Sequence, residues 1–246
     1  MLKSLNEIMK FSVEATDGEM GSVYDFLFSD KNWAIRYLVV DTGNWLPGRK
    51  VLVPVTALGE VDWTDQTFSV DETREEIKEG PDIDTDKPVS RQEEEMLHGF
   101  YGWFPYWQTG IQPASTGIMT RIPEPAQAEQ EARKKGDPHL RSTREVDGYH
   151  INATDGEIGH VEDFLADEEQ WIIRFLVVDT RNWLPSKKVL ISPQWATEVD
   201  WHDQQLHMDK SRQEIREAPE YDPLLALERE KEEEILRYYG MPKYWL

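Results

Sequence analysis

Four histidines in the second half of the chain have a spacing that could bind a metal ion. They flank two expected tight turns as two pairs, so the imidazoles of each pair could converge from neighbouring strands, as zinc or nickel ligands do. Exposed positions on the polar face of a strand explain the same spacing, and no histidine recurs at the matching position of the first half. The sequence therefore predicts no metal ion, with a zinc or nickel site confined to the second half as the alternative. The four residues are His150, His160, His202 and His207.

Six aspartates, three in each half, have the chemistry to bind a cation or to act as acid–base pairs. Each follows an expected strand or adjoins an expected turn, where an aspartate commonly accepts hydrogen bonds from backbone amides. We therefore expect structural roles for them, and we expect Arg36 and Arg174 to pair with one of these carboxylates across strands. The aspartates are Asp25, Asp41, Asp62, Asp163, Asp179 and Asp200.

No other arrangement in the sequence is typical of an enzyme. The chain has no cysteine, which removes thiolate nucleophiles, thiolate metal ligands and disulfides. It has no Ser-His-Asp spacing, P-loop, HExxH helix or dinucleotide-binding fingerprint. Gly18 with Gly21, and Gly156 with Gly159, resemble a phosphate loop, but no helix start follows them and Asp-Gly favours a tight hairpin. The sequence predicts a protein that is not an enzyme, with no catalytic residue and no cofactor.

One loop motif indicates an interaction surface instead. Asn-Trp-Leu-Pro occurs twice in expected loops, where tryptophan and leucine are unfavourable unless they cover the core or contact a partner. Folding back over the sheet as a lid is one explanation. The other is contact between the two halves or with another protein, for which tryptophan is a common anchor. Lys50 and Lys188 follow closely and could pair with acidic neighbours. The candidate surface is Asn44, Trp45, Leu46, Pro47, Asn182, Trp183, Leu184 and Pro185.

The elements that must position these residues occur twice, because the chain repeats itself at an offset of 138 residues. Ala15, for example, corresponds to Ala153. More than half of positions 15–84 are identical to those 138 residues later. A repeat of this length is a domain and not a solenoid unit. We expect a first domain over 1–107, a linker over 108–138 and a second domain over 139–246. Outside the repeat core, Leu2, Ser4, Glu7 and Phe11 match Leu140, Ser142, Glu145 and Tyr149, and Glu93–Leu97 match Glu232–Leu236 after a slip of one residue.

Within each half, alternating apolar residues and turn signals predict about six short strands at roughly ten-residue spacing. Capping-box patterns at Thr73–Glu76 and Ser90–Glu93 then predict short helices. The aromatic tails Tyr101–Trp107 and Tyr238–Trp245 are expected to fold back on apolar surface. The predicted fold is therefore all-β with short appended helices: two tandem small antiparallel β-barrels packed as a pseudo-symmetric pair. In the first half, the expected strands cover 11–15, 20–28, 33–40, 50–53, 61–63 and 68–70.

The composition restricts the class of partner. The chain has 48 acidic against 27 basic residues, a formal net charge of −21. This charge disfavours direct binding to nucleic acid or to anionic lipid headgroups. No apolar window approaches the length of a membrane span, and the first residues reach a charge before an apolar core of signal-peptide length. We therefore expect no membrane insertion, a cytoplasmic location and a protein partner that is basic or membrane-associated.

Two motifs resemble a known family. The run D-G-E-x-G-x-V-x-D-F-L, at 17–27 and 155–165, is similar to the PRC-barrel family. The string R-x-L-V-V-D-T-x-N-W-L-P, at 36–47 and 174–185, strengthens this resemblance. The family consists of small β-barrels found in the cytoplasmic domain of the photosynthetic reaction-centre H subunit and in a ribosome-maturation factor. This sequence looks closest to the H-subunit-like branch, with two copies of the barrel.

The resemblance implies a non-enzymatic adaptor or structural module. By similarity to the H subunit, it implies association with a membrane electron-transfer or photosynthetic complex. The alternative that it implies is an accessory factor in ribosome assembly or RNA processing that binds a basic ribosomal protein. The membrane helix of the H subunit and the N-terminal domain of the maturation factor both lack a counterpart here. We also expect the two barrels to pair within the chain, and a homo-oligomer is compatible with the sequence.

Overall fold

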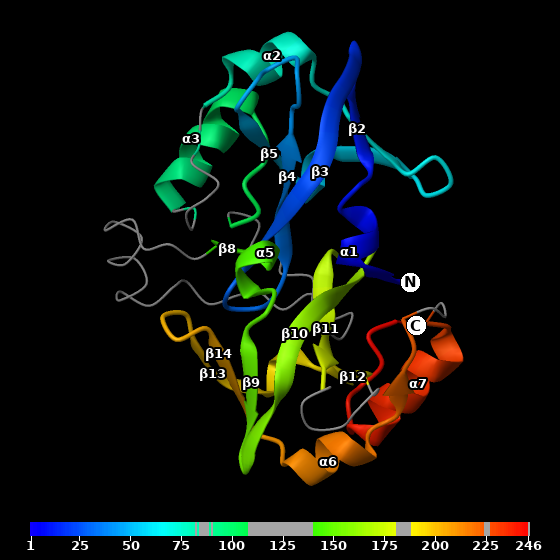
Figure 1. Cartoon of the computed structure of the whole chain (residues 1–246). Coiled ribbons are helices and arrows are strands. Elements are labelled where there is room, and N and C mark those ends of the chain that lie inside the picture. Colours follow the sequence, from blue (N-terminus) through cyan, green and yellow to red (C-terminus); the bar gives the residue numbers. More distant parts are fainter. Residues whose placement is uncertain are drawn as a thin grey trace. The chain divides into compact units, whose positions relative to one another are not determined.

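The computed structural model describes residues 1–81, 83, 89, 91–107, 140–180, 188–223 and 227–245 (Figure 1). By its internal contacts the chain divides into two compact units. Unit 1 consists of Met1–Glu7 together with Thr143–Leu246, and unit 2 consists of Ile8–Ser142. Each unit is described separately below. The linker predicted over 108–138 lies outside the described residues.

The strands of unit 2 are β2 (Ser12–Ala15), β3 (Gly18–Ser29), β4 (Ile35–Asp41), β5 (Lys50–Pro54), β6 (Leu58–Asp62), β7 (Thr67–Val70) and β8 (Leu140–Ser142). They form one sheet in the order β5-β4-β3-β2-β7-β6, and β8 pairs with β3 beside this path. The long strand β3 is the centre of the sheet, because it contacts β2, β4 and β8.

The strands of unit 1 are β1 (Leu2–Ser4), β9 (His150–Ala153), β10 (Gly156–Asp167), β11 (Ile172–Asp179), β12 (Lys188–Ile191), β13 (Ala196–Asp200), β14 (Gln205–Met208) and β15 (Glu220–Tyr221). Their order is β13-β14-β9-β10-β11-β12-β15, and β1 pairs with β10. The prediction of mostly β structure with short helices is confirmed in both units.

The predicted arrangement of the strands is wrong at one ladder in each unit. Strands β2 and β7 pair in parallel, as do β9 and β14, whereas the sequence predicted antiparallel sheets. Tight turns reveal only antiparallel neighbours, so turn signals could not show a ladder between strands separated by most of a unit. Among the described residues the strand order is an open path in each unit, and no ladder closes it into a barrel.

Short helices flank the two sheets. Thr73 caps α2 (Arg74–Glu79) with a complete capping box, as predicted, and Ser211 caps α6 (Arg212–Glu217) in the same way. Ser90, the predicted start of α3 (Arg91–Tyr101), lies outside the described residues. No helix in the described ranges is long and apolar enough to cross a membrane. The remaining helices are α1 (Leu5–Ile8), α5 (Thr143–Val146), α7 (Arg229–Tyr238) and the 3-10 turns η1 (Val55–Ala57) and η2 (Pro193–Trp195).

The first strand of each half pairs with a strand of the opposite half. Strand β1 opens the sequence but pairs with β10, and β8 precedes the second repeat but pairs with β3. The compact units therefore differ from the predicted domains, 1–107 and 139–246, because the segments that open the two halves are exchanged.

Most residues of the aromatic tails fold back on their own units, as expected, whereas Phe104 and Tyr238 are exposed. Tyr101, Trp103 and Tyr106 pack against the apolar cluster of unit 2 that contains Leu27, Val39 and Leu97. In unit 1, the corresponding cluster of Leu165, Val177 and Ile235 is covered by Tyr239, Tyr244 and Trp245. The helices α3 and α7 are thereby fixed to their sheets through the chain that follows them.

Candidate functional site

The predicted interaction loop of unit 2 is tied closely to its sheet. The hydroxyl oxygen of buried Thr42 lies 2.8 and 2.7 Å from the carbonyl oxygens of Leu46 and Arg49, so its single hydrogen is shared between two carbonyls and closes the loop. The indole of Trp45 is half-buried and donates to the Met20 carbonyl, while the Arg74 guanidinium lies 4.7 Å from the centre of its ring. These contacts give Trp45 a structural role on the sheet.

The other residues of this loop differ in exposure. Leu46 is half-buried, whereas Asn44 and Pro47 are exposed. Only these two exposed side chains and the edges of the others remain for a partner. The matching residues of the second half, Asn182, Trp183, Leu184 and Pro185, lie outside the described residues.

The two lysines that follow the loops have different contacts. The Lys188 amine forms an ion pair with Glu162 at 2.6 Å, as expected from the sequence. The Lys50 amine lies 4.1 Å from the centre of the Tyr24 ring.

We expect Trp45→Phe to lower the free energy of unfolding by about 1 kcal/mol, because it removes the indole donor and leaves the Met20 carbonyl unsatisfied. Urea denaturation of the variant and the wild type measures this difference. An unchanged stability would contradict the structural role and favour the alternative that Trp45 serves a partner.

A second surface, which the sequence analysis missed, lies on and after α3. Met96, Phe100 and Phe104 are 55%, 47% and 67% exposed. Met96 and Phe100 lie on one face of the helix because they are four residues apart, and Phe104 follows the helix at the same interval. We call these three side chains the α3 ridge. Their spacing in the sequence, two intervals of four residues, was the available signal.

The surroundings of the α3 ridge are acidic. Glu95 is exposed beside Met96, and the half-buried Glu93 lies one turn before it. The positions 138 residues later are Glu234, Tyr238 and Pro242, so unit 1 has a single exposed aromatic side chain there instead of three apolar ones. The hydroxyl of Tyr238 donates to the Glu214 carbonyl at 2.7 Å. The apolar ridge is therefore specific to unit 2.

The opposite face of α3 is a buried polar cluster. Glu94 is fully buried and accepts a hydrogen bond of 2.6 Å from the Tyr106 hydroxyl. The Tyr37 hydroxyl lies 3.1 Å from the same carboxylate and 2.7 Å from Nε2 of buried His98. The Arg36 guanidinium lies 4.1 Å from the centre of the Tyr106 ring. This cluster holds the helix and the aromatic tail in one orientation and so presents the α3 ridge outward.

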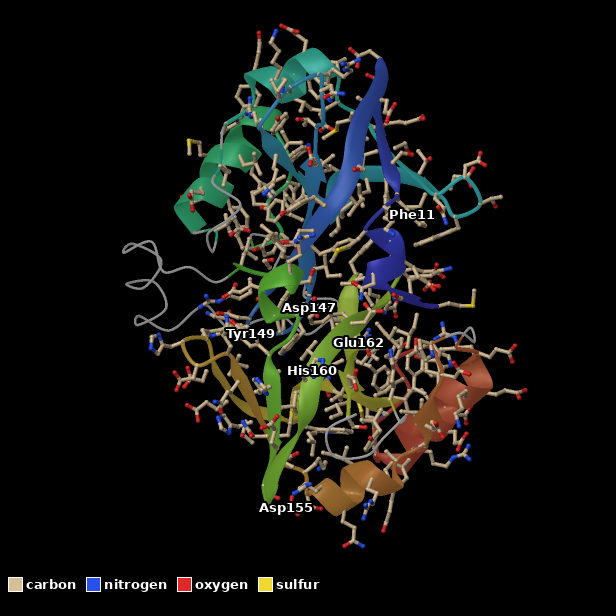
Figure 2. All side chains as sticks on the ribbon, viewed as in Figure 1. Phe11, Asp147, Tyr149, Asp155, His160 and Glu162 are labelled. Carbon is tan, nitrogen blue, oxygen red and sulfur yellow. The ribbon has the colours of Figure 1, made fainter. Side chains whose placement is uncertain are left out.

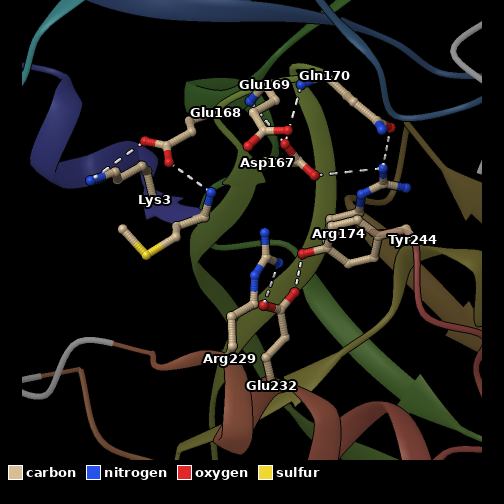
Figure 3. Close-up of polar contacts among 10 residues, drawn as sticks. Lys3, Asp167, Glu168, Glu169, Gln170, Arg174, Arg229, Glu232 and Tyr244 are labelled. Carbon is tan, nitrogen blue, oxygen red and sulfur yellow. Dashed lines mark hydrogen bonds and ion pairs between the residues drawn. The ribbon is translucent and has the colours of Figure 1, made fainter. Parts of the chain in front are cut away.

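Unit 1 has a related cluster in which ion pairs replace the histidine (Figure 3). Buried Glu232 accepts a hydrogen bond from the Tyr244 hydroxyl and pairs with Arg229 at 3.0 Å. Burial raises the pKa of Glu232 above its usual range, against the opposing effects of its bonds to Tyr244 and Arg229. Burial and the neighbouring Glu232 carboxylate likewise raise the pKa of Tyr244.

This cluster corrects the sequence alignment of the two halves. Glu94 and Glu232 accept from Tyr106 and Tyr244, and both pairs of residues are 138 positions apart. The repeat therefore continues through the helices at its original offset, and the predicted slip of one residue is wrong. Three consecutive glutamates in each helix made both alignments possible, and burial of one carboxylate distinguishes them.

The expected arginine–aspartate pair exists in unit 1 with a different partner. The buried Arg174 lies 3.8 Å from Asp167, which is not among the six predicted aspartates. Burial lowers the pKa of Arg174, and Asp167 opposes this effect. The guanidinium also lies 4.0 Å from the centre of the Tyr244 ring (Figure 3). Asp167 was missed because its counterpart in the first half is Ser29, so the repeat did not mark it.

Five of the six predicted aspartates accept hydrogen bonds from backbone amides, as expected. Asp163 has the most contacts, with bonds from the amides of Asn6 and Phe164 and from the Ser4 hydroxyl at 3.1, 2.7 and 2.5 Å. Burial raises the pKa of Asp163 despite these bonds. The others are Asp25, Asp41, Asp62 and Asp200; Asp179 is buried at the end of β11.

The raised pKa of Asp163 predicts a pH dependence of stability. The folded protein binds this proton more tightly than the unfolded chain, so its contribution is complete below the ordinary pKa of 3.8 and is lost as the pH rises through the folded value. The unfolding free energy of the wild type should therefore fall as the pH rises through the folded pKa of Asp163. We expect a smaller fall in Asp163→Asn, which has no carboxyl group to titrate. Thermal denaturation between pH 4 and 8 measures it, and parallel profiles for variant and wild type would contradict it.

The first histidine pair is placed across its hairpin as predicted, whereas the second is not, because His207 lies opposite Glu198 and not opposite His202. His150 and His160 are directly opposed across β9 and β10, whose connecting turn carries Asp155 at its tip (Figure 2). Nδ1 of His150 lies 3.0 Å from the exposed Glu157 carboxylate. His202 is in the turn after β13, and His207 is on β14. Within the described ranges, no group of three or more His, Asp or Glu residues could hold a metal ion.

Comparison with known proteins identifies part of the chain. A PRC-barrel domain is found at residues 3–77. This range runs from β1 to α2, so it includes the strand that pairs with β10. No curated protein is significantly similar to the chain.

Proposed function

We propose, from the PRC-barrel domain at residues 3–77, that the protein is a non-enzymatic interaction module that binds another protein through the α3 ridge. The exposure of three large apolar side chains at a spacing of four residues carries this proposal. Contiguous apolar surface of this kind is uncommon on a protein that acts alone, and it marks sites of protein interaction. We further propose that residues 139–246 are a second PRC-barrel copy, because they repeat the matched sequence and strand order.

The partner that suits this surface is apolar and basic. An apolar face would cover Met96, Phe100 and Phe104, and lysine or arginine beside it would meet Glu93 and Glu95. The net charge of −21 would raise the rate of association with such a protein and make it sensitive to salt.

Two partner classes follow from the family. One is a membrane electron-transfer or photosynthetic complex, as for the reaction-centre H subunit, and the other is a basic ribosomal protein during small-subunit assembly. Fractionation of cell extract separates them, because the first places the protein with membranes and the second with free small ribosomal subunits. A profile with neither membranes nor subunits would contradict both classes.

The α3 ridge is tested by the double variant Phe100→Ser/Phe104→Ser. Its matched control is Tyr238→Ser, which changes the exposed aromatic residue at the position of unit 1 that corresponds to Phe100. We expect the wild type and the control to retain the same bound protein at low salt and to release it at high salt, and the ridge variant to lose it. Equal retention by all three proteins, or equal loss from the control, would contradict the proposal.

A further inference from the structure

The edges of β3 and β10 each hold a short strand in the same register. In unit 1, Lys3 lies opposite Ala166 and Ser4 opposite Leu165. In unit 2, Arg141 lies opposite Phe28 and Ser142 opposite Leu27. Every residue of the second ladder is 138 positions from its counterpart in the first. In both ladders the short strand comes from one half of the chain and the long strand from the other half.

The side-chain contacts of the two short strands are also equivalent. Ser4 donates to Asp163 at 2.5 Å in unit 1, and Ser142 donates to Asp25 in unit 2. Leu2 packs in the apolar cluster of unit 1, and Leu140 in that of unit 2. The exchange therefore satisfies the same hydrogen bond and buries the same type of side chain in both units.

Unit 1 adds contacts beyond the shared ones. Asn6 donates from its amide to Asp163 and from its side chain to the Glu162 carbonyl, at 3.1 and 3.0 Å. The terminal amine of Met1 lies 2.7 Å from the Glu168 carboxylate. The Lys3 amine lies 3.6 Å from the same carboxylate (Figure 3). The first residues are therefore held by more contacts than one ladder of three residues provides.

We propose that the edge of β3 and the edge of β10 are docking sites for the Leu-x-Ser strand of another half-chain. The opposite half of the same chain supplies the strand here, and a second copy of the chain supplies it when copies are concentrated. Since all the contacts above are kept when the strand comes from a second copy, the two arrangements differ mainly in effective concentration. This inference concerns the assembly of the chain itself and stands apart from the α3 ridge.

A cysteine pair tests the exchange directly, because the natural chain has no cysteine. Directly opposed residues in an antiparallel ladder have Cα atoms about 4.5–5.5 Å apart, within the range of a disulfide. We expect Lys3→Cys/Ala166→Cys to oxidise completely. After cleavage at a protease site inserted within residues 108–138, the two fragments should remain linked on a non-reducing gel.

The matched control is Arg141→Cys/Ala166→Cys, which shares one cysteine and would form a disulfide only if each half kept its own strand. We expect this variant to retain two free thiols, with a circular dichroism spectrum like that of the wild type. Oxidation of the control and free thiols in the first variant would overturn the exchange.

The second copy as a partner is tested by refolding Lys3→Cys/Ala166→Cys at several concentrations before oxidation. With an effective concentration in the millimolar range, covalent dimers should form roughly 1% of the product at 10 µM and tens of per cent near 1 mM. A dimer fraction that does not change over this range would overturn the role of a second copy.

Discussion

Gly21→Ala is expected to prevent stable folding of unit 2, lowering the free energy of unfolding by more than about 3 kcal/mol. A Cβ at this position would lie 2.0 Å from the carbonyl oxygen of Asp41, and the residue has a φ of +148°. A side-chain movement can relieve neither the clash with the carbonyl oxygen nor the strain of the positive φ, because both involve the backbone of paired strands. Urea denaturation followed by far-ultraviolet circular dichroism measures the loss.

The chain provides a matched variant and a control for this prediction. Gly159→Ala should have a similar effect on unit 1, since its Cβ would lie 1.9 Å from the Asp179 carbonyl oxygen. Gly99→Ala changes a helical glycine with no atom within 4 Å and should stabilise α3 by about 0.5–1 kcal/mol. An unfolding midpoint of Gly21→Ala equal to that of the wild type would show that the two strands do not approach as described.

Glu232→Ala is expected to lower the free energy of unfolding by about 1–3 kcal/mol, because it leaves the Tyr244 hydroxyl without its hydrogen-bond acceptor. Arg229 would lose its ion pair and Tyr244 its acceptor. Glu232→Gln should cost less, since the amide oxygen still accepts from Tyr244. Chemical denaturation of the three proteins gives the order of stability.

Release of the aromatic tail provides a local measurement for the same variants. Lys243 precedes Tyr244, and its amine pairs with Glu233 at 2.8 Å. We expect a lysine-specific protease to cleave after Lys243 faster in Glu232→Ala than in the wild type. Cleavage at the same rate in both would contradict a role for Glu232 in holding the tail.

Features that depend on neighbouring residues were predictable from the sequence. The Asp17-Gly18 pair marked the turn between β2 and β3, and the Thr73–Glu76 pattern marked the start of α2. Each of these features is fixed by backbone conformation and local hydrogen bonds, which residue types a few positions apart determine. The aromatic tails were expected to cover apolar surface for a different reason, because so many aromatic residues are unfavourable in a solvent-exposed segment.

The exchange of the first strands could not be predicted. Leu2 and Leu140 are identical, as are Ser4 and Ser142, so either strand satisfies either sheet in composition and hydrogen bonding. Only the path of the backbone distinguishes the two arrangements. The parallel ladders were missed for a related reason, since their strands are distant in sequence and no turn joins them.

The candidate surfaces show the limit of motif analysis. Asn-Trp-Leu-Pro was predicted to be an interaction surface because tryptophan is unfavourable in a loop. The Trp45 indole instead donates a hydrogen bond to its own sheet. No motif marked Met96, which is exposed because Glu94 and Leu97 occupy the inward positions of the helix. Hydrophobicity alone would place Met96 toward the core. The contacts of Glu94 with Tyr37 and Tyr106 place the Glu94 side of the helix there instead.

The pairing of β1 with β10 also has a consequence during synthesis. Lys3 cannot meet Ala166 until about 160 further residues have been translated, which takes roughly 10–30 s at 5–20 residues per second. Through most of that interval the edge of β3 is uncovered too, because Leu140–Ser142 is synthesised long after Phe28. Nascent chains on adjacent ribosomes would therefore present complementary strands and edges to one another, and the spacing of ribosomes on the message would influence which copy completes each sheet.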